Sequence, residues 1–96
     1  MIMVTAKITA KAGEKDKIVS KAQNLIQSTR LESGCISYNL YNGTEDNNTL
    51  LMLEKWENQD VLNLHMQTEH FKAFNTAVEN ILAKEVDITI YSINEL

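Results

Sequence analysis

The sequence predicts an α+β domain with the element order β-α-β-β-α-β and a four-stranded antiparallel sheet. Three observations lead to this prediction: four segments alternate apolar and polar residues, the segments between them carry apolar residues at helical spacing, and turn residues separate the segments. The chain has 96 residues, which is enough for one domain and too few for two. We therefore expect residues 1–96 to form a single domain.

The N-terminal half predicts the first three elements. Apolar residues alternate with polar ones over residues 2–10, which is typical of a strand. Over residues 14–31, apolar side chains recur at i, i+4, i+7 and i+8 and predict a helix that covers the sheet. Gly34 follows this segment, and alternation over residues 35–42 predicts a second strand. The apolar side chains expected to share one face of that strand are Ile36, Tyr38 and Leu40.

The next segments predict a third strand and a broken helix. A cluster of turn residues leads to the strand at residues 49–56, in which both faces carry apolar side chains and need cover. Asn58 or Asp60 can cap a short helix over residues 61–66, and Thr68 can cap a second helical piece. The residues with helical spacing in that second piece are Phe71, Phe74, Val78, Ile81 and Leu82.

Alternation over residues 86–93 predicts the fourth strand, which completes the order of a ferredoxin-like fold. In that fold the helices cover one face of the sheet. The opposite face would combine polar side chains with one apolar row of the third strand. Packing of a second copy, sheet against sheet, would bury that row, so we expect a homodimer that forms an α+β barrel; a solvated face is the alternative.

Composition argues against several classes of partner. Nine basic and thirteen acidic residues give a formal net charge of −4, and the basic residues are scattered, so nucleic acid is not expected. No apolar run approaches the roughly 18 residues that a membrane span requires. Cys35 is the only cysteine and the chain does not start with a leader pattern, so we expect a cytoplasmic protein. No nucleotide, flavin or haem motif occurs, so we expect no cofactor.

Both histidines are candidate catalytic residues. His65 follows Val61 by four residues and Leu62 by three, so its side chain should lie on the apolar side of the short helix, as a hydrogen-bonded core residue or in a cavity wall. His70 lies four residues before Phe74 and is either part of the site or a partly exposed polar residue. A separation of five residues places the two imidazoles about 140° apart on one helix. A broken helix could bring them together, but no cysteine or acidic cluster at ligand spacing supplies the other ligands, so we expect no metal site.

Three further residues could contact a ligand. Glu54 and Trp56 share one face at the end of the third strand, where a carboxylate can orient a histidine, hold a substrate hydroxyl or pair with a lysine. The Tyr38 hydroxyl could reach a ligand, although strand tyrosines more often pack in the core. No neighbouring residue marks Cys35 as a nucleophile, and we expect it to act as a small hydrophobic residue.

Three motifs occur in order along the chain: E-x-G-C at residues 32–35, E-x-W at residues 54–56 and H-x4-H-F at residues 65–71. Together they resemble the antibiotic-biosynthesis-monooxygenase family, and in particular its bacterial quinol monooxygenase branch. The resemblance extends over nearly the whole chain, and the C-terminal half is its more specific part. It implies a ferredoxin-like fold, a dimeric barrel, a pocket between sheet and helices, and oxidation of quinol-like substrates without a cofactor.

Related branches offer other activities. Haem-degrading relatives use an Asn, a Trp and a His where this chain has Ala6, His65 and Asn75, so haem degradation is not expected. Another branch isomerises a phosphorylated, sugar-derived signal, and its histidine-bearing helix also resembles this one. An isomerase of a small phosphorylated hydroxyketone is therefore one alternative, and a non-catalytic dimer that binds a small molecule is another.

We expect a monooxygenase that uses dioxygen on a quinol, phenol or anthrone, because a reaction without flavin or metal needs a substrate that itself donates electrons. An imidazole with an ordinary pKa of about 6.5 suits a base at neutral pH, so His65 is predicted to be the base or a hydrogen-bond partner, assisted by His70. The residues expected to shape the pocket or contact the substrate are Trp56, Phe71, Phe74, Glu54 and Tyr38. In the isomerase alternative, the phosphate would need Lys7, Lys55 or Lys72 near the pocket.

Overall fold

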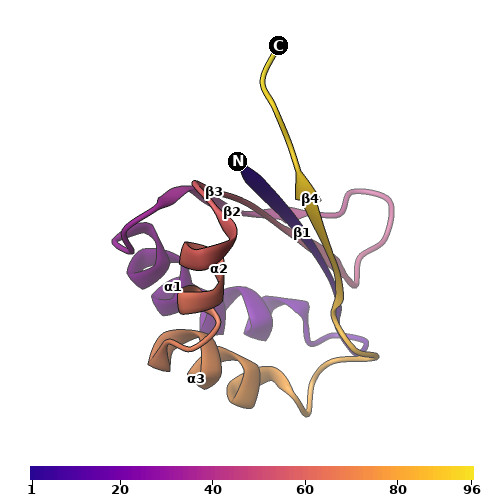
Figure 1. Ribbon diagram of the computed structural model, residues 1–96. Helices are drawn as coiled ribbons and strands as arrows, with labels where there is room; N and C mark the ends of the chain where they lie inside the picture. Colours follow the sequence, from indigo (N-terminus) through magenta and orange to yellow (C-terminus); the bar gives the residue numbers. More distant parts are fainter.

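The computed structural model describes all 96 residues and contains four strands and three helices (Figure 1). The strands form one antiparallel sheet in the order β2-β3-β1-β4. This is the ferredoxin-like arrangement, so the predicted fold class is confirmed, while the dimeric barrel stays a prediction. The elements are β1 (Ile2–Thr9), α1 (Lys15–Arg30), β2 (Cys35–Asn42), β3 (Thr49–Trp56), α2 (Gln59–His65), α3 (Glu69–Val78) and β4 (Asp87–Ser92).

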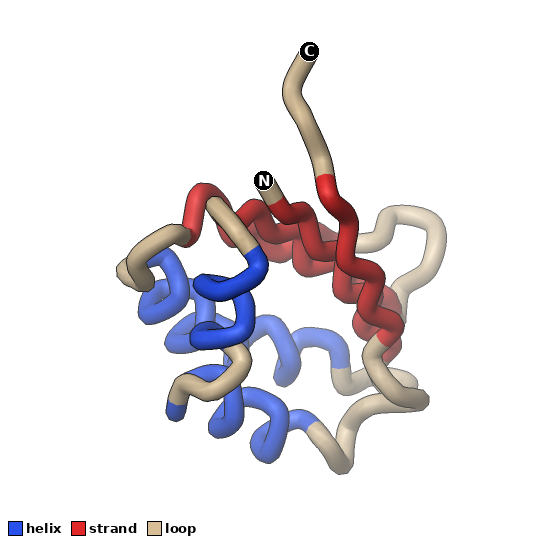
Figure 2. The backbone as a smooth tube through the Cα atoms, viewed as in Figure 1, coloured by secondary structure: helices blue, strands red, loops and turns tan.

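All three helices lie on the same side of the sheet, as Figure 2 shows, and the core lies between these two layers. The period-2 pattern of the central strands explains this arrangement, because it directs one apolar row of each strand toward the helices. The rows from β1 and β3 pack against the apolar stripe of α1, and none of the helices is long and apolar enough to span a membrane. The core residues of these three elements include Val4, Ile8, Ile18, Ala22, Leu25, Leu50 and Met52.

The two faces of β3 differ in burial. Met52 is buried under the helices, and Glu54 and Trp56 continue the same inward row. Leu51 points to the opposite face and is 36% exposed, beside its cross-strand neighbour Tyr41, which is also exposed. The outer face of the sheet therefore keeps an uncovered apolar area in the single chain.

Two capping residues place the histidine-bearing helices. The side chain of Asn58 accepts a hydrogen bond from the Val61 backbone N–H at the start of α2. Thr68 caps α3 by accepting from the Phe71 N–H, and its hydroxyl also donates to the carbonyl of His65 at 2.7 Å. Because Thr68 bonds in both directions, it holds the end of α2 against the start of α3.

Two local expectations were wrong. Ile36 was expected on the same face of β2 as Tyr38. A β-bulge between Cys35 and Ser37 shifts the register, and Ile36 is exposed, whereas Tyr38 is buried. Helix α3 ends at Val78 and does not continue to residue 82. The chain leaves the helix there because its backbone bonds to the end of β1 and to the residues that follow it: the Ala83 N–H donates to the Thr9 carbonyl at 2.8 Å, and the Lys11 N–H donates to the Ile81 carbonyl at 2.9 Å. An isolated bridge pairs Ala10 with Leu82.

Candidate functional site

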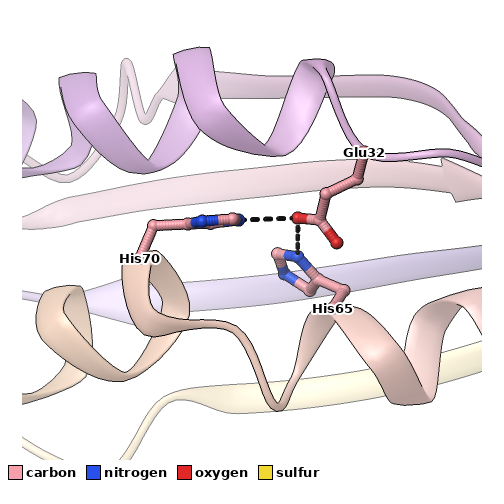
Figure 3. A group of neighbouring side chains, drawn as sticks. All are labelled: Glu32, His65 and His70. Carbon is pink, nitrogen blue, oxygen red and sulfur yellow. Dashed lines mark hydrogen bonds and ion pairs between the residues drawn. The ribbon is translucent and has the colours of Figure 1, made fainter.

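The two histidines meet at one carboxylate, that of Glu32, which lies two residues beyond the end of α1. The Oε2 atom of Glu32 is 2.7 Å from Nδ1 of His65 and 2.7 Å from Nε2 of His70 (Figure 3). A carboxylate only accepts hydrogen bonds, so both imidazoles donate to it. His65 is the last residue of α2 and His70 the second of α3, so the break between these helices brings both rings to the same oxygen.

This contact determines which nitrogen of His65 is free. Burial lowers the pKa of His65 below its ordinary value, although the hydrogen bond to Glu32 and its charge act in the opposite direction. The neutral ring therefore predominates at neutral pH, with its proton on Nδ1 facing Glu32. The lone pair then lies on Nε2, a buried atom that has no hydrogen-bond partner.

Aromatic rings hold the imidazole of His65 in place. The Trp56 indole lies with its ring centroid 4.7 Å away, and Phe71 and Tyr38 meet the imidazole in edge-on orientations at 5.0 Å and 5.5 Å. His65 is only 1% exposed. Such packing leaves the ring little freedom to rotate, so the orientation set by Glu32 is maintained.

A cavity of about 110 Å³ lies between the sheet and the helices, and His65 forms part of its wall. Thirteen of its sixteen lining residues are hydrophobic, and no lysine or arginine is among them. Ile88 and Ile90 of β4 line it and are about half exposed, as no helix covers this edge strand fully. The cavity therefore opens at the β4 side. The lining residues are Val4, Ala6, Ile8, Leu25, Tyr38, Met52, Glu54, Leu62, His65, Met66, Phe71, Phe74, Asn75, Val86, Ile88 and Ile90.

Glu54 places a second titratable group in the cavity wall. Its Oε1 accepts a hydrogen bond from Nε1 of Trp56 at 2.9 Å. Burial raises the pKa of Glu54 to about 7, and the charge of Glu32 acts in the same direction against the effect of that hydrogen bond. Burial also raises the pKa of Tyr38 well above its usual range, with a further contribution from Glu54. The phenol stays protonated, so its hydroxyl can donate to a ligand.

The structure brings five of the seven predicted site residues to the cavity wall: Tyr38, Glu54, His65, Phe71 and Phe74. Trp56 and His70 do not line it. Trp56 is fully buried and supports the His65 ring, while His70 bonds to Glu32. The lysines considered for a phosphate, Lys7, Lys55 and Lys72, are also absent from the lining.

Sequence reasoning did not identify Glu32, which lies 33 residues from His65 and 38 from His70. Its one local signal is the E-x-G-C motif. Gly34 of that motif has a φ of +86°, and a Cβ there would lie 2.7 Å from the Val61 side chain. A glycine is therefore needed for α2 to pack against this turn, and that packing brings His65 to Glu32.

Two other features bear on the chemistry of this region. Burial raises the pKa of the Cys35 thiol to about 11, with Glu32 and Glu54 acting in the same direction, so this cysteine is a poor nucleophile. The ligand-type atoms of Glu32, His65 and His70 all lie within 4.8 Å of one another, which is the spacing of side chains that can share a metal ion. The expectation of no metal assumed that a third ligand was missing, and the tertiary structure supplies one.

Known proteins resemble this chain in sequence and fold. A curated Synechocystis relative, "Uncharacterized protein sll1783", is 36% identical over 98% of this chain, which spans 64% of that protein's length. The Bacillus subtilis protein named "Putative monooxygenase YcnE" is 32% identical, over 99% of this chain and 100% of its own length. A crystal structure of a conserved protein from Methanosarcina mazei superimposes with a TM-score of 0.89 at 34% identity, covering 94% of this chain and 89% of that one.

The family comparison covers the three motifs identified in the sequence. The model of the family described as "Antibiotic biosynthesis monooxygenase" matches residues 1–77, a range that includes Glu32, Glu54, His65 and His70. This match extends over most of the chain and agrees with the relatives of similar length. The chain belongs to the antibiotic biosynthesis monooxygenase family.

Proposed function

We propose that this protein is a monooxygenase that oxidises quinol- or anthrone-like aromatics with dioxygen and no cofactor, with His65 as the general base. The observation that carries this proposal is the Nε2 atom of His65, which is buried, has no hydrogen-bond partner and belongs to a ring in the cavity wall. Because Glu32 binds the proton on Nδ1, Nε2 can accept a proton from a substrate.

For an anthrone, the reaction begins when Nε2 removes a proton from the substrate and leaves an electron-rich enolate. The enolate transfers an electron to dioxygen and then joins it at carbon, which gives a peroxide anion. That anion takes the proton back from His65. Loss of water from the hydroperoxide leaves a new carbonyl, so one oxygen atom enters the product and the other leaves as water.

Glu32 would assist this step electrostatically. When His65 accepts a proton it becomes an imidazolium, and the carboxylate 2.7 Å from Nδ1 stabilises that charge. His70, on the same oxygen, keeps the carboxylate oriented. Glu54 is the second candidate for moving a proton, because its carboxyl lies in the cavity wall and its pKa is about 7.

The size and polarity of the cavity support an aromatic substrate. Engineered cavities of ~150 Å³ bind benzene, so the volume of about 110 Å³ is on the scale of one ring, and a fused ring system would extend toward the opening at β4. A phosphorylated hydroxyketone would need cationic partners, and the lining has none. The cavity therefore favours the monooxygenase over the isomerase. A measurement of turnover distinguishes the monooxygenase from a protein that only binds its ligand.

The uncovered outer face of the sheet supports a homodimer. Exposed apolar side chains lie on β2, β3 and β4 of this face, including Tyr41, Leu51 and Tyr91. Sheet-on-sheet packing of two copies would bury this area and form the α+β barrel expected from the sequence.

Oxygen uptake with a panel of reduced naphthoquinols and anthrones, corrected for spontaneous oxidation, tests the proposed activity. We expect uptake by metal-free and flavin-free protein, together with formation of an anthraquinone from an anthrone and of a hydroxylated quinone from a naphthoquinol. Turnover of a phosphorylated hydroxyketone without oxygen uptake would replace the proposal with the isomerase. Ligand binding without turnover in either assay would replace it with a binding role.

A further inference from the structure

We propose that Glu32, His65 and His70 form a binding site for a divalent transition-metal ion of the Zn²⁺ type, and that the bound ion switches off His65 as a base. The first statement rests on the geometry of the three side chains. The second rests also on the function proposed above.

The donor set matches the ion. Two imidazole nitrogens and one carboxylate oxygen are a common protein ligand set for Zn²⁺, with water in the remaining position. Ligand atoms about 2.1 Å from a tetrahedral ion lie roughly 3.4 Å from one another. The two nitrogens here are 2.7 Å from the Glu32 oxygen, and all three atoms lie within 4.8 Å of one another. To admit an ion, each O–N distance would lengthen by roughly 0.7 Å and the N–N distance would shorten by at most roughly 1.4 Å.

The charge around Glu32 also favours a cation. No lysine or arginine forms an ion pair with this carboxylate, and its partners are the two imidazoles. The nearby Arg30 donates instead to the Tyr38 carbonyl and the Asn39 side chain. A divalent ion would thus meet a carboxylate that no lysine or arginine neutralises.

Burial indicates the side from which the ion enters. The side chains of Glu32 and His70 are 14% and 19% exposed, whereas that of His65 is 1% exposed. Neither Glu32 nor His70 lines the cavity, so the ion would reach His65 from the side away from the substrate. Figure 3 shows the three side chains, with one oxygen of the Glu32 carboxylate facing both rings. The ion and the substrate would therefore occupy separate places around one imidazole.

The consequence for His65 follows from its tautomers. A metal ion binds the lone pair of a ring nitrogen, so coordination at Nδ1 moves the proton of the neutral ring to Nε2. An Nε2–H group cannot accept a proton from the substrate. Metal binding would thus lower kcat while leaving the cavity open, which distinguishes it from competitive inhibition.

Isothermal titration calorimetry tests the site, with Zn²⁺ alone added to tag-free, chelator-treated protein. We expect one ion per chain in the wild type. Glu32→Gln and His70→Asn should each lose at least the roughly 10-fold to 100-fold in affinity that a change in a group supporting a metal ligand causes. The exposed neighbour change Glu69→Gln and the thiol change Cys35→Ser should bind as the wild type does. Cu²⁺ provides a second readout, because an ion bound to His65 should quench the fluorescence of Trp56, the only tryptophan, whose ring lies 4.7 Å from the imidazole.

Either of two results would overturn the site: no binding by the wild type, or undiminished binding by both ligand variants. Circular dichroism identifies a variant that fails to fold, and the other variant then decides the result. Adding Zn²⁺ to the oxygen-uptake assay tests the switch. Turnover of the wild type should fall at the ion concentration that fills the site, while His70→Asn should keep its own metal-free rate at that concentration. If Zn²⁺ binds but does not inhibit oxygen uptake, the switch is wrong and the metal site stands. If Zn²⁺ binds to a protein that shows no turnover at all, the proposed function is wrong and the metal site stands.

Discussion

The carboxylate of Glu32 lies 2.7 Å from Nδ1 of His65 although 33 residues separate them in the chain. This contact connects the turn after α1 with the last residue of α2 and leaves Nε2 of the imidazole as the free nitrogen. The first two predictions follow from it.

Replacing Glu32 with Gln should lower kcat by roughly 10-fold to 100-fold, because the imidazolium formed in the reaction loses its negative partner. Steady-state oxygen uptake measures the effect, and KM should change little, since Glu32 does not line the cavity. Glu69→Gln, which removes an exposed carboxylate beside His70, should leave kcat unchanged. A wild-type rate in Glu32→Gln would show that this carboxylate does not act on the base.

Replacing His65 with Gln should lower turnover by about 100-fold or more, in the range of a general base, while the volume of the side chain is largely preserved. Val78→Ala is the matched comparison, because Val78 is equally buried but lies outside the cavity wall. That variant should lose about 1 to 3 kcal/mol of stability and keep its activity per folded molecule. If His65→Gln instead melts early and turns over normally, His65 is a core residue and the proposed base is wrong.

Glu54→Gln should stabilise the protein above pH 7. Burial raises the pKa of Glu54 from 4.5 to about 7, so the folded state holds this proton more tightly than the unfolded state does. The contribution of Glu54 to the free energy of unfolding is complete below pH 4.5 and is lost as the pH rises through 7. This loss amounts to about 3 kcal/mol at most. The neutral amide avoids this loss and can still accept from Trp56. Urea unfolding at pH 4.5 and pH 8 should show a gain only at pH 8, and Glu57→Gln, at an exposed position, should show none.

Leu51→Glu should dissociate the proposed dimer, because it would place an unpaired charge in the interface on the outer face of the sheet. Light scattering at micromolar concentration should give two chains for the wild type and one for the variant. Leu64→Glu is the control, since Leu64 is 63% exposed on α2, away from that face. A wild-type protein that scatters as a single chain contradicts the barrel.

Gly34→Ala should destabilise the protein more than Gly13→Ala does. Both glycines have positive φ, which costs an alanine about 1 to 2 kcal/mol. At Gly13 nothing lies within 4 Å of the added Cβ, whereas at Gly34 the Val61 side chain is 2.7 Å away. Thermal unfolding should rank the variants in that order, and Gly34→Ala should also reduce turnover by displacing Glu32 from His65. Equal melting temperatures would contradict the proposed close packing of α2 on this turn.

The sequence by itself determined the elements, because each depends on interactions between near neighbours. Period-2 alternation specifies the strands. Asn58 and Thr68 cap the two pieces of the second helical region, as the sequence predicts, because each side chain accepts a hydrogen bond from the backbone N–H three residues ahead. The inward placement of His65 follows in the same way from its spacing to Val61 and Leu62. These features require no knowledge of distant residues.

Only the tertiary structure decided what the histidines contact. Glu32 is distant in sequence, and packing of α2 against the turn at Gly34 brings it to both rings. The same packing leaves Trp56 behind His65 and outside the cavity wall, although both belong to the recognised motifs. Burial likewise sets the pKa of Glu54, because desolvation depends on which atoms surround a carboxyl in three dimensions and alternation along a strand carries no information on them.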